Sequence, residues 1–348
     1  MQKNWLVIFV IGVLIIIAIP ILYFLVVDKK DVQTSKVKYI HNEGFTQGTT
    51  YSVTYQQPEA IDLQKKIEIR LHEFDMSLST YIPNSIISRI NSNDTTVKTD
   101  MLFETMFNAA QEVSRHTNGA LDITVGPLVK AWGFAFGNKD HSKLPNVLDF
   151  LPYVGYQKVR IKDHKLIKDD LRILIDANSI AQGYSTDIIA NLLKDNGCKN
   201  YMIEIGGEIA CKGMNPKGKK WSIGIDKAID DSTNASDGLQ TIISITDCAV
   251  TTAGGYRKFY VKNGKKYSHI IDPRTGYPVN NNLLSVTVVA LTAIMADAYD
   301  TPFMVLGVDS CLKVCKSIPG MDCYLIYVDK NGKNQVIYTD GFKKYLSN

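Results

Sequence analysis

The sequence predicts an α+β fold that follows a membrane-spanning helix, and three observations support this prediction. A long uncharged segment occupies residues 5–27. Beyond it, the predicted helices and strands do not alternate in the regular β-α-β order of a parallel sheet. Residues 329–332 separate two runs of β-branched and aromatic residues, which is typical of a hairpin between antiparallel strands. A chain of 348 residues is long enough to bury a large core.

The first element is the apolar segment at residues 5–27, in which Leu, Ile and Val dominate. A helix of this length would measure about 35 Å, and the hydrocarbon core of a bilayer is about 30 Å thick. A signal peptide has a shorter apolar region and a small-residue cleavage site, so we expect an uncleaved anchor at residues 1–27, with a cleaved signal as the alternative. Lys3 lies on one side and Lys29 and Lys30 on the other, so the charges alone do not settle the orientation.

The elements that follow are predicted from hydrophobic periodicity and turn residues. Residues 28–44 are polar and aperiodic, and we expect them to link the anchor to a domain at residues 45–348. Apolar residues at helical spacing predict three helices, of which two end at Asn-Gly pairs. Short β-branched and aromatic runs predict strands. The helices are expected at residues 61–74, 101–116 and 180–194, and the strands at 48–55, 171–175, 201–205, 221–225, 241–245, 284–290, 323–328 and 335–339.

The overall charge argues against nucleic-acid binding. The chain has 39 basic and 35 acidic residues, a net charge of +4, and no contiguous run of five like charges. Proteins that bind nucleic acid usually concentrate basic residues in one dense patch. The six cysteines include no C-x-x-C pair of the kind that binds zinc. We therefore expect buried thiols, with a disulfide as the alternative in an oxidising compartment.

Asp297, Asp300 and Thr301 are spaced i, i+3 and i+4, which places their side chains on one face of a helix. Two carboxylates and a hydroxyl suit a hard cation such as Mg²⁺, which completes its coordination with phosphate oxygens and water. The alternative is a helix with a solvated acidic face. Pro302 removes one helix hydrogen bond, which leaves open whether Thr301 lies at a kink or begins a new helix.

A polar turn at residues 272–276 follows His269 and carries groups that can hold a phosphate. Histidine titrates near neutrality, so His269 is a candidate general base, although a lone histidine is also often structural. A predicted helix begins after Ser179, and its unpaired amides and positive dipole end suit a phosphate. Together these features indicate a nucleotide site that works through a divalent cation.

Seven segments, taken in order, resemble the ApbE family, whose members are FAD:protein FMN transferases. The resemblance covers about residues 48–307, most of the chain beyond the predicted anchor. It implies a T-fold-like α+β domain with FAD in a cleft. The segments are residues 78–85, 119–127, 176–187, 205–208, 251–256, 269–276 and 296–301.

The resemblance also implies a reaction and the residues that perform it. Family members use Mg²⁺ to split FAD, release AMP and attach FMN through a phosphoester to a Thr or Ser hydroxyl of a partner protein. His269 matches the histidine proposed to deprotonate that hydroxyl. By the same match, the metal would be held by the backbone carbonyl of Ala181 and by Asp297, Asp300 and Thr301, and the flavin nucleotide by Gln47, Tyr81, Ala120, Leu121, Asp122, Asn178, Tyr184 and Ile271.

Two positions depart from the family pattern. Members often have Met where this chain has Gln47, and Lys where it has Gln182, so one positive charge near the phosphates is replaced. Neither change removes an expected metal ligand or the expected base. We therefore expect effects on affinity and rate and no change of reaction type.

The expected setting follows from the same resemblance. Family members usually modify flavoproteins of ion-pumping redox complexes outside the cytoplasmic membrane. We expect an anchor in the bacterial inner membrane, a domain that faces the periplasm, and an acceptor flavoprotein subunit of a membrane redox complex as partner. Two alternatives are a magnesium-dependent FAD pyrophosphatase, in which water replaces the acceptor hydroxyl, and a flavin-binding protein without catalytic activity.

Overall fold

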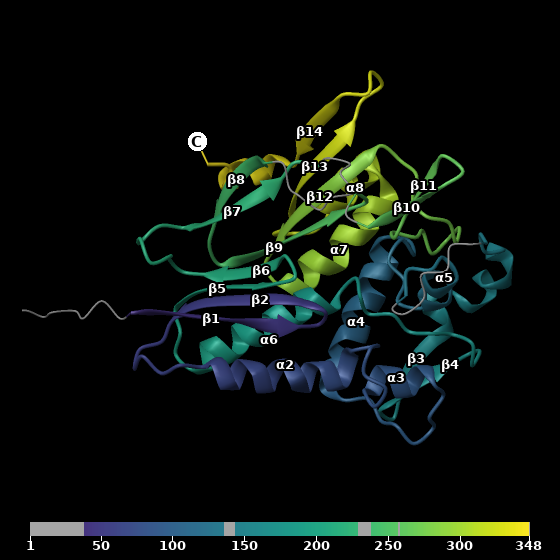
Figure 1. The fold of residues 1–348 in the computed structure, drawn as a ribbon, viewed down its shortest axis with the longest axis horizontal. Helices are drawn as coiled ribbons and strands as arrows, with labels where there is room; N and C mark the ends of the chain where they lie inside the picture. The colour runs from purple at the N-terminus through teal and green to yellow at the C-terminus, as the bar shows by residue number, and fades with distance from the viewer. Residues whose placement is uncertain (1–37, 136–142, 229–237, 257, 348) are drawn as a thin grey trace, which may run out of the picture. The chain divides into compact units, whose positions relative to one another are not determined.

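An eight-stranded antiparallel sheet forms the framework of the domain (Figure 1). The computed structural model describes residues 38–135, 143–228, 238–256 and 258–347. The sheet has the order β1-β2-β5-β6-β9-β12-β13-β14, and every neighbouring pair is antiparallel. Its strands are β1 (Tyr39–Thr46), β2 (Thr49–Gln56), β5 (Asn200–Ile205), β6 (Glu208–Lys212), β9 (Cys248–Gly254), β12 (Leu283–Ala290), β13 (Asp322–Val328) and β14 (Asn334–Tyr338). The antiparallel sheet confirms the α+β prediction.

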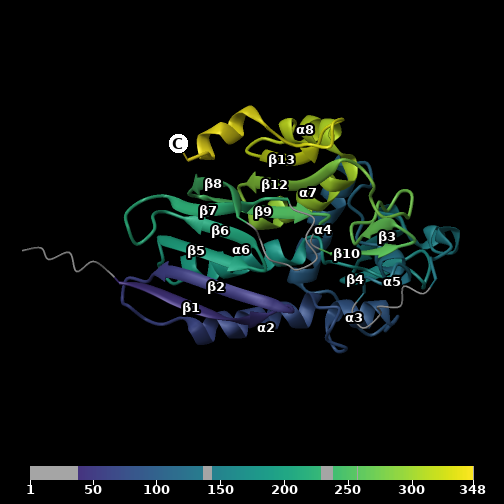
Figure 2. The same ribbon diagram turned by 45° about the horizontal axis from the view of Figure 1, so that its top comes forward.

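Helices pack on one face of this sheet (Figures 1 and 2). The side chains of β2 alternate between the two faces, and Tyr51, Val53 and Tyr55 are buried in one apolar cluster with residues of two helices. A second cluster joins β12 and β13 to the remaining long helices. The helices are α2 (Gln64–Leu78), α3 (Ile86–Asn91), α4 (Met101–His116), α5 (Gly126–Ala131), α6 (Ala181–Asp195), α7 (Ala293–Leu306) and α8 (Val308–Lys316).

The opposite face of the sheet is covered by a two-stranded ribbon. Strands β7 (Trp221–Asp226) and β8 (Leu239–Ile245) pair with each other, and Trp221 and Ile243 are buried with side chains of β6, β9 and β13. Two further ribbons, β3 (Val159–Lys162) with β4 (Lys165–Lys168) and β10 (Phe259–Lys262) with β11 (Lys265–Ser268), lie outside the large sheet. Short 3₁₀ helices occupy Val147–Asp149, Leu151–Tyr153, Tyr156–Lys158 and Asp340–Tyr345.

The structure confirms most predicted elements. Helix α4 has the predicted limits because an Asp100 cap begins it and the Asn118-Gly119 pair, with φ of 51° and 77°, follows its end. The terminal hairpin β13–β14 forms around the predicted turn at residues 329–332. Helix α7 continues through Pro302, so Thr301 neither ends this helix nor begins another. All six cysteines are buried free thiols, as expected.

Two predicted elements are wrong. Residues 39–44 belong to strand β1 and not to a linker, because this edge strand has an irregular burial pattern that hides its periodicity. The described domain therefore begins at Tyr39. The strand predicted at residues 171–175 does not form, since Leu171 is largely exposed and Leu174 makes only an isolated bridge to Val125.

The predicted anchor at residues 1–27 lies outside the described residues. None of the helices in the described part of the chain combines the length and the apolar character needed to cross a membrane.

Candidate functional site

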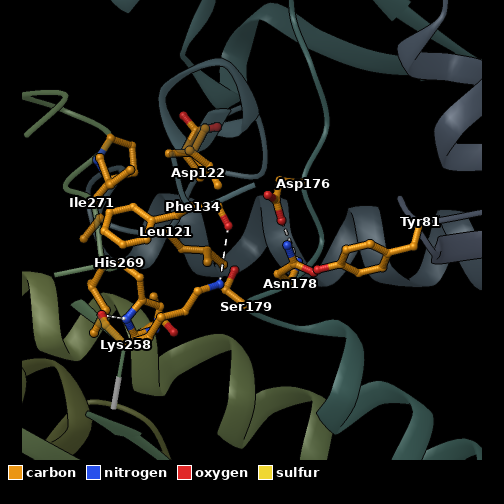
Figure 3. A pocket seen from close by; sticks show the side chains of 16 residues that line it. Tyr81, Leu121, Asp122, Phe134, Asp176, Asn178, Ser179, Lys258, His269 and Ile271 are labelled. Atoms are coloured by element: carbon orange, nitrogen blue, oxygen red, sulfur yellow. Dashed lines mark hydrogen bonds between the residues drawn. The ribbon is translucent and has the colours of Figure 1, made fainter. Parts of the chain in front are cut away.

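A cavity of about 210 Å³ gathers most of the predicted site residues (Figure 3). Its wall is built by the loop after α2, the loop after α4, the segment before α6, the base of the β10–β11 ribbon and helix α7. Figure 3 shows His269, Lys258 and Phe134 on one side of the cavity and Tyr81 on the other. The predicted residues in this wall are Tyr81, Ala120, Leu121, Asp122, Asn178, His269, Ile271 and Thr301.

A second cavity of about 190 Å³ adjoins the first. Tyr81 and Asn178 belong to both walls, and Tyr81 is 48% exposed, so its ring is available to a ligand. The predicted residues Gln47 and Ala181 line this second cavity. Gln47 lies in the β1–β2 turn with a φ of 50°, and its side-chain oxygen accepts a hydrogen bond from Ser185 Oγ at 3.4 Å.

The loop at residues 120–125 is fixed by Asp122. One carboxylate oxygen accepts hydrogen bonds from the backbone N–H and the hydroxyl of Thr124, at 2.8 and 2.6 Å, and the other accepts the N–H of Tyr156 at 2.7 Å. Burial nevertheless raises the pKa of Asp122. Both oxygens therefore hold the loop that presents Ala120 and Leu121 to the cavity.

Asp176 lines the same wall and was not predicted as a site residue. Its backbone N–H donates to Ile123 O at 2.7 Å, and its side chain accepts the N–H of Asn178 at 2.8 Å. Burial raises the pKa of its carboxyl, and the positive charge of Lys258 opposes that shift. Asp176 thus joins the loop after α4 to the segment that begins α6.

The backbone at Lys258 fixes the orientation and tautomer of His269. The carbonyl of Lys258 lies 3.0 Å from the backbone N of His269 and 2.9 Å from its Nδ1. A carbonyl oxygen only accepts, so Nδ1 must carry the proton. In the neutral ring, Nε2 is then the nitrogen that can take up a proton. This is the arrangement that a general base needs.

Helices α6 and α7 cap each other. Neither helix has a side-chain hydrogen bond from its own N-cap residue. Both carboxylate oxygens of Asp187, in α6, accept the first amides of α7, from Ala293 at 2.9 Å and Ile294 at 2.8 Å. In return, Asp297 Oδ2 in α7 accepts Gly183 N in α6 at 2.7 Å. This reciprocal pair of carboxylates holds two helix N-termini in a fixed relation.

Gly183 is required where the two helices meet. A Cβ atom at this position would lie 2.3 Å from the carbonyl oxygen of Ala293 and 2.5 Å from Cβ of Asp297. Any larger residue would push the helices apart. The glycine at position 183 is therefore explained by the close packing of the two helices.

The predicted metal ligands lie at this helix contact. Asp297 and Asp300 are buried, at 5% and 3% exposure, and Thr301 Oγ1 donates to Asp300 Oδ1 at 3.1 Å. Burial raises the pKa of Asp297 to about 7. Burial also raises the pKa of Asp300, and the neighbouring carboxylates of Asp297 and Glu208 raise it further.

These oxygen donors fit a divalent cation. A bound positive charge would strongly stabilise two buried carboxylates that repel each other. Carboxylate, hydroxyl and carbonyl oxygens are the hard ligands that Mg²⁺ and Ca²⁺ prefer. The described residues contain no cluster of three or more His, Cys, Asp or Glu side chains suited to a metal. A cation here would therefore depend on the Thr301 hydroxyl and the Ala181 carbonyl in addition to Asp297 and Asp300.

Tyr184, like Asp297 and Asp300, lines neither cavity. It is the fourth residue of α6, and it lies on the same helix face as Ile188, which packs into the core. Its ring makes an edge-to-face contact with Phe74, with centroids 5.4 Å apart, and is only 7% exposed. The ring therefore packs in the core of the structure, and its contact with the flavin nucleotide stays a prediction.

Lys258 is the main residue that the sequence analysis missed. It lines the cavity, and its Nζ donates to Phe134 O at 3.3 Å (Figure 3). The available signal was Asn263-Gly264, a strong hairpin turn between two short β-branched and aromatic runs. A hairpin centred there places Lys258 beside His269. Asp187 was also missed, because spacing within one helix does not show which neighbouring helix it caps.

Comparison with known proteins agrees with the predicted family. The sequence model of the ApbE family matches residues 47–325. A Vibrio cholerae protein named FAD:protein FMN transferase is 36% identical over 318 residues, which cover 88% of this chain and 90% of the relative. A protein of the same name from Escherichia coli K12 is 32% identical over 340 residues, which cover 94% of this chain and 93% of the relative.

Solved structures agree as well. The flavin transferase ApbE from Vibrio cholerae superimposes with a TM-score of 0.80 at 34% identity, and the match covers 89% of this chain and 99% of that one. The ApbE protein from Thermotoga maritima gives a TM-score of 0.77 at 25% identity, with 89% and 100% covered. The resemblance predicted from the sequence is confirmed, and this chain belongs to the ApbE family.

Proposed function

We propose that this chain is an FAD:protein FMN transferase, an enzyme that moves FMN from FAD to a Thr or Ser hydroxyl of a partner flavoprotein and releases AMP. The names of its relatives support the reaction class. The observation that carries the proposal is the cavity that brings His269 and Thr301 together with Tyr81 and Asn178. This cavity combines a base, an edge of the acidic helix face and an exposed aromatic ring.

The reaction requires a nucleophile and a base. The acceptor hydroxyl oxygen attacks the phosphorus of the FMN half of FAD and forms the new P–O bond. The bond from that phosphorus to the bridging oxygen breaks, and AMP leaves with the electron pair. The hydroxyl proton passes to Nε2 of His269, because an alcohol is a poor nucleophile at neutral pH without a base. The Lys258 carbonyl keeps Nδ1 protonated during this step.

Magnesium is the proposed cofactor. Asp297, Asp300, Thr301 and the Ala181 carbonyl would hold it. When bound, it supplies positive charge that stabilises the negative charge developing on the pyrophosphate. The mutual capping of α6 and α7 supports this assignment, because it fixes the spacing between Ala181 at the start of α6 and the three ligands of α7.

The pair of cavities suits a ligand with two aromatic ends. FAD carries a flavin and an adenine joined through a pyrophosphate, and the two cavities meet at Tyr81 and Asn178. We place the pyrophosphate near this junction, close to the N-terminus of α6, where the helix dipole favours negative charge. Gln182 lines the second cavity and offers a neutral amide to that ligand.

The experiment that tests this function is incubation of the full chain in detergent with FAD, Mg²⁺ and a candidate acceptor. We expect equal amounts of AMP and of acceptor that carries FMN, measured by chromatography and mass spectrometry. Free FMN and AMP without a mass gain on the acceptor would favour an FAD pyrophosphatase. Intact FAD after prolonged incubation would favour a flavin-binding protein.

We further propose that the chain is anchored in the bacterial inner membrane with its domain in the periplasm. The uncharged segment at residues 5–27 supports this location. The acceptor would then be a flavoprotein subunit of a membrane redox complex in the same compartment.

A further inference from the structure

The walls of the two cavities carry little positive charge for a ligand that contains a pyrophosphate. Among the described residues that line them, Lys258 is the only Lys or Arg and His269 is the only histidine. The acidic residues in the same walls are Asp75, Asp122 and Asp176. An anion that leaves water needs hydrogen-bond donors or positive charge beside it. The Lys258 ammonium is the side-chain cation that the described walls offer to a phosphate.

The backbone of Lys258 is held at the edge of the first cavity. Its carbonyl accepts hydrogen bonds from His269, from the backbone N at 3.0 Å and from Nδ1 at 2.9 Å. Figure 3 shows the Lys258 side chain extending from the side of His269 into the cavity, where a dashed line joins it to Phe134. Its positive charge opposes the rise in the pKa of Asp176, so the ammonium lies within electrostatic reach of the segment before α6. The N-terminus of that helix also favours a phosphate.

The Lys258 ammonium keeps donors for a ligand. Its Nζ donates one hydrogen bond, to the neutral carbonyl of Phe134 at 3.3 Å. Lys258 is exposed, and within the described part of the chain it forms no ion pair with a carboxylate. An ammonium has three N–H donors. Two donors and an unpaired positive charge therefore remain for an anion that enters the cavity.

A structural role alone does not explain this lysine. The segment that carries Phe134 is fixed by other contacts, because the ring of Trp132 stacks on Tyr267 with centroids 5.5 Å apart. Trp132 Nε1 also donates to Gly276 O at 2.8 Å, in a buried hydrogen bond. A hydrogen bond of 3.3 Å from an exposed lysine to a neutral carbonyl adds little to these contacts. We therefore expect the fold to tolerate the loss of the Lys258 ammonium.

We propose that the Lys258 ammonium binds the phosphate of the FMN half of FAD, on the side from which the acceptor hydroxyl attacks. This inference rests on the proposed function, because it names a further binding residue for the same substrate. The acceptor oxygen must lie close to His269, which takes its proton, and the bridging oxygen leaves on the opposite side of the phosphorus. Lys258 lies on the His269 side of the cavity (Figure 3). It therefore contacts the phosphate that is transferred and not the AMP that departs.

Flavin binding tests this inference without requiring transfer. FMN and riboflavin differ only by the phosphate, and neither contains the bond that the enzyme breaks. Each is titrated into the full chain in detergent, without divalent cations, and followed by flavin fluorescence. The variant Lys258→Met removes the charge, and Lys258→Arg keeps it. The matched control, Lys165→Met, removes an exposed lysine of β4 whose Nζ also donates to a backbone carbonyl, that of Thr95 at 3.1 Å.

We expect the wild type to bind FMN more tightly than riboflavin. Lys258→Met should weaken FMN binding by roughly tenfold, the effect of losing one charge-assisted hydrogen bond, and should leave riboflavin binding unchanged. Lys258→Arg should restore most of the FMN affinity, and the control should behave as the wild type. In the transfer assay, Lys258→Met should raise the KM for FAD by a similar factor with a smaller change in kcat, because the contact exists before the transition state.

Three results would overturn the assignment of Lys258 while leaving the transferase intact. The first is equal affinity of the wild type for FMN and riboflavin, which needs no variant. The second is unchanged FMN affinity in Lys258→Met. The third is an equal loss of FMN and riboflavin binding in that variant, which would show a structural role. Failure of the wild type to bind either flavin, with FAD left intact in the transfer assay, would overturn the proposed function and this inference with it.

Discussion

At His269, a backbone carbonyl selects the tautomer that a general base needs. Nδ1 donates to Lys258 O at 2.9 Å, and Nε2 is left as the basic nitrogen of the neutral ring. The ring of Phe134 makes an edge-to-face contact with the imidazole, with centroids 6.4 Å apart. The position of the imidazole is therefore set before an acceptor arrives, which reduces the cost of orienting it during the reaction.

The variant His269→Ala should slow FMN transfer by roughly 10²- to 10⁴-fold, the usual contribution of a general base. FAD affinity should stay close to that of the wild type. The control is His164→Ala, which removes an exposed histidine paired with Glu104. Transfer is measured as flavin fluorescence on the acceptor after gel separation. Wild-type rates in the His269 variant would rule out this residue as the base.

The buried carboxylate of Asp300 gives a prediction about Mg²⁺ affinity. Its carboxylate is buried beside Asp297 and Glu208, so a bound cation should stabilise it strongly. Asp300→Asn should weaken Mg²⁺ binding by more than roughly tenfold, since even outer ligands of metal sites contribute 10- to 100-fold. Magnesium is titrated into the FAD-saturated protein by calorimetry, with Asp309→Asn, an exposed change in α8, as control. Equal Mg²⁺ affinity in both variants would contradict the assignment.

At the scale of elements, the site depends on how α6 and α7 meet. The sequence predicted both helices but not their mutual capping, because periodicity shows which face is apolar and not which neighbour that face contacts. The same limit explains why the sequence did not predict that the ring of Tyr184 packs against Phe74. It also explains why Lys258 was missed, since its place beside His269 depends on the β10–β11 pairing.

Asp187 gives a pH-dependent prediction for this helix pair. Burial raises the pKa of its carboxyl from the usual 3.8 to about 6 in the folded protein. Between those values the folded state binds more protons than the unfolded state, so stability falls as pH rises. The stability of the wild type relative to Asp187→Asn should therefore decrease from about pH 4 to about pH 6 and level off above it.

This trend is measured by urea unfolding of both proteins without divalent cations, at intervals between pH 4 and pH 7. Asp195→Asn, an exposed change at the end of α6, serves as the control. A constant difference between the wild type and Asp187→Asn across this range would show that Asp187 does not titrate as its burial implies.

Across the whole molecule, the sequence predicted best those features that depend only on residues close together in the chain. The Asn-Gly turn after α4 and the helical spacing of Asp297, Asp300 and Thr301 are local signals, and the structure confirms both. Strand β1 is an edge strand with mixed burial, so its pattern was mistaken for a linker. The strand expected at residues 171–175 failed because alternating apolar residues alone do not supply a pairing partner.

The proposed anchor gives a prediction about the complete chain. The full-length protein should stay with the inner membrane after alkaline extraction, because about 20 apolar residues are enough to span a bilayer. In intact spheroplasts only the periplasmic face of the inner membrane is accessible, so protease added from outside should digest the domain. Release into the soluble periplasmic fraction would instead indicate a cleaved signal peptide.

Flavin transfer by this chain can be observed in the mass spectrum of a candidate acceptor flavoprotein that is co-expressed with it. We expect one Thr or Ser to carry FMN through a phosphoester, and we expect this modification to disappear with Asp300→Asn or His269→Ala. An unmodified acceptor, in cells where the wild-type chain is folded and FAD and Mg²⁺ are abundant, would rule out the proposed transfer of FMN.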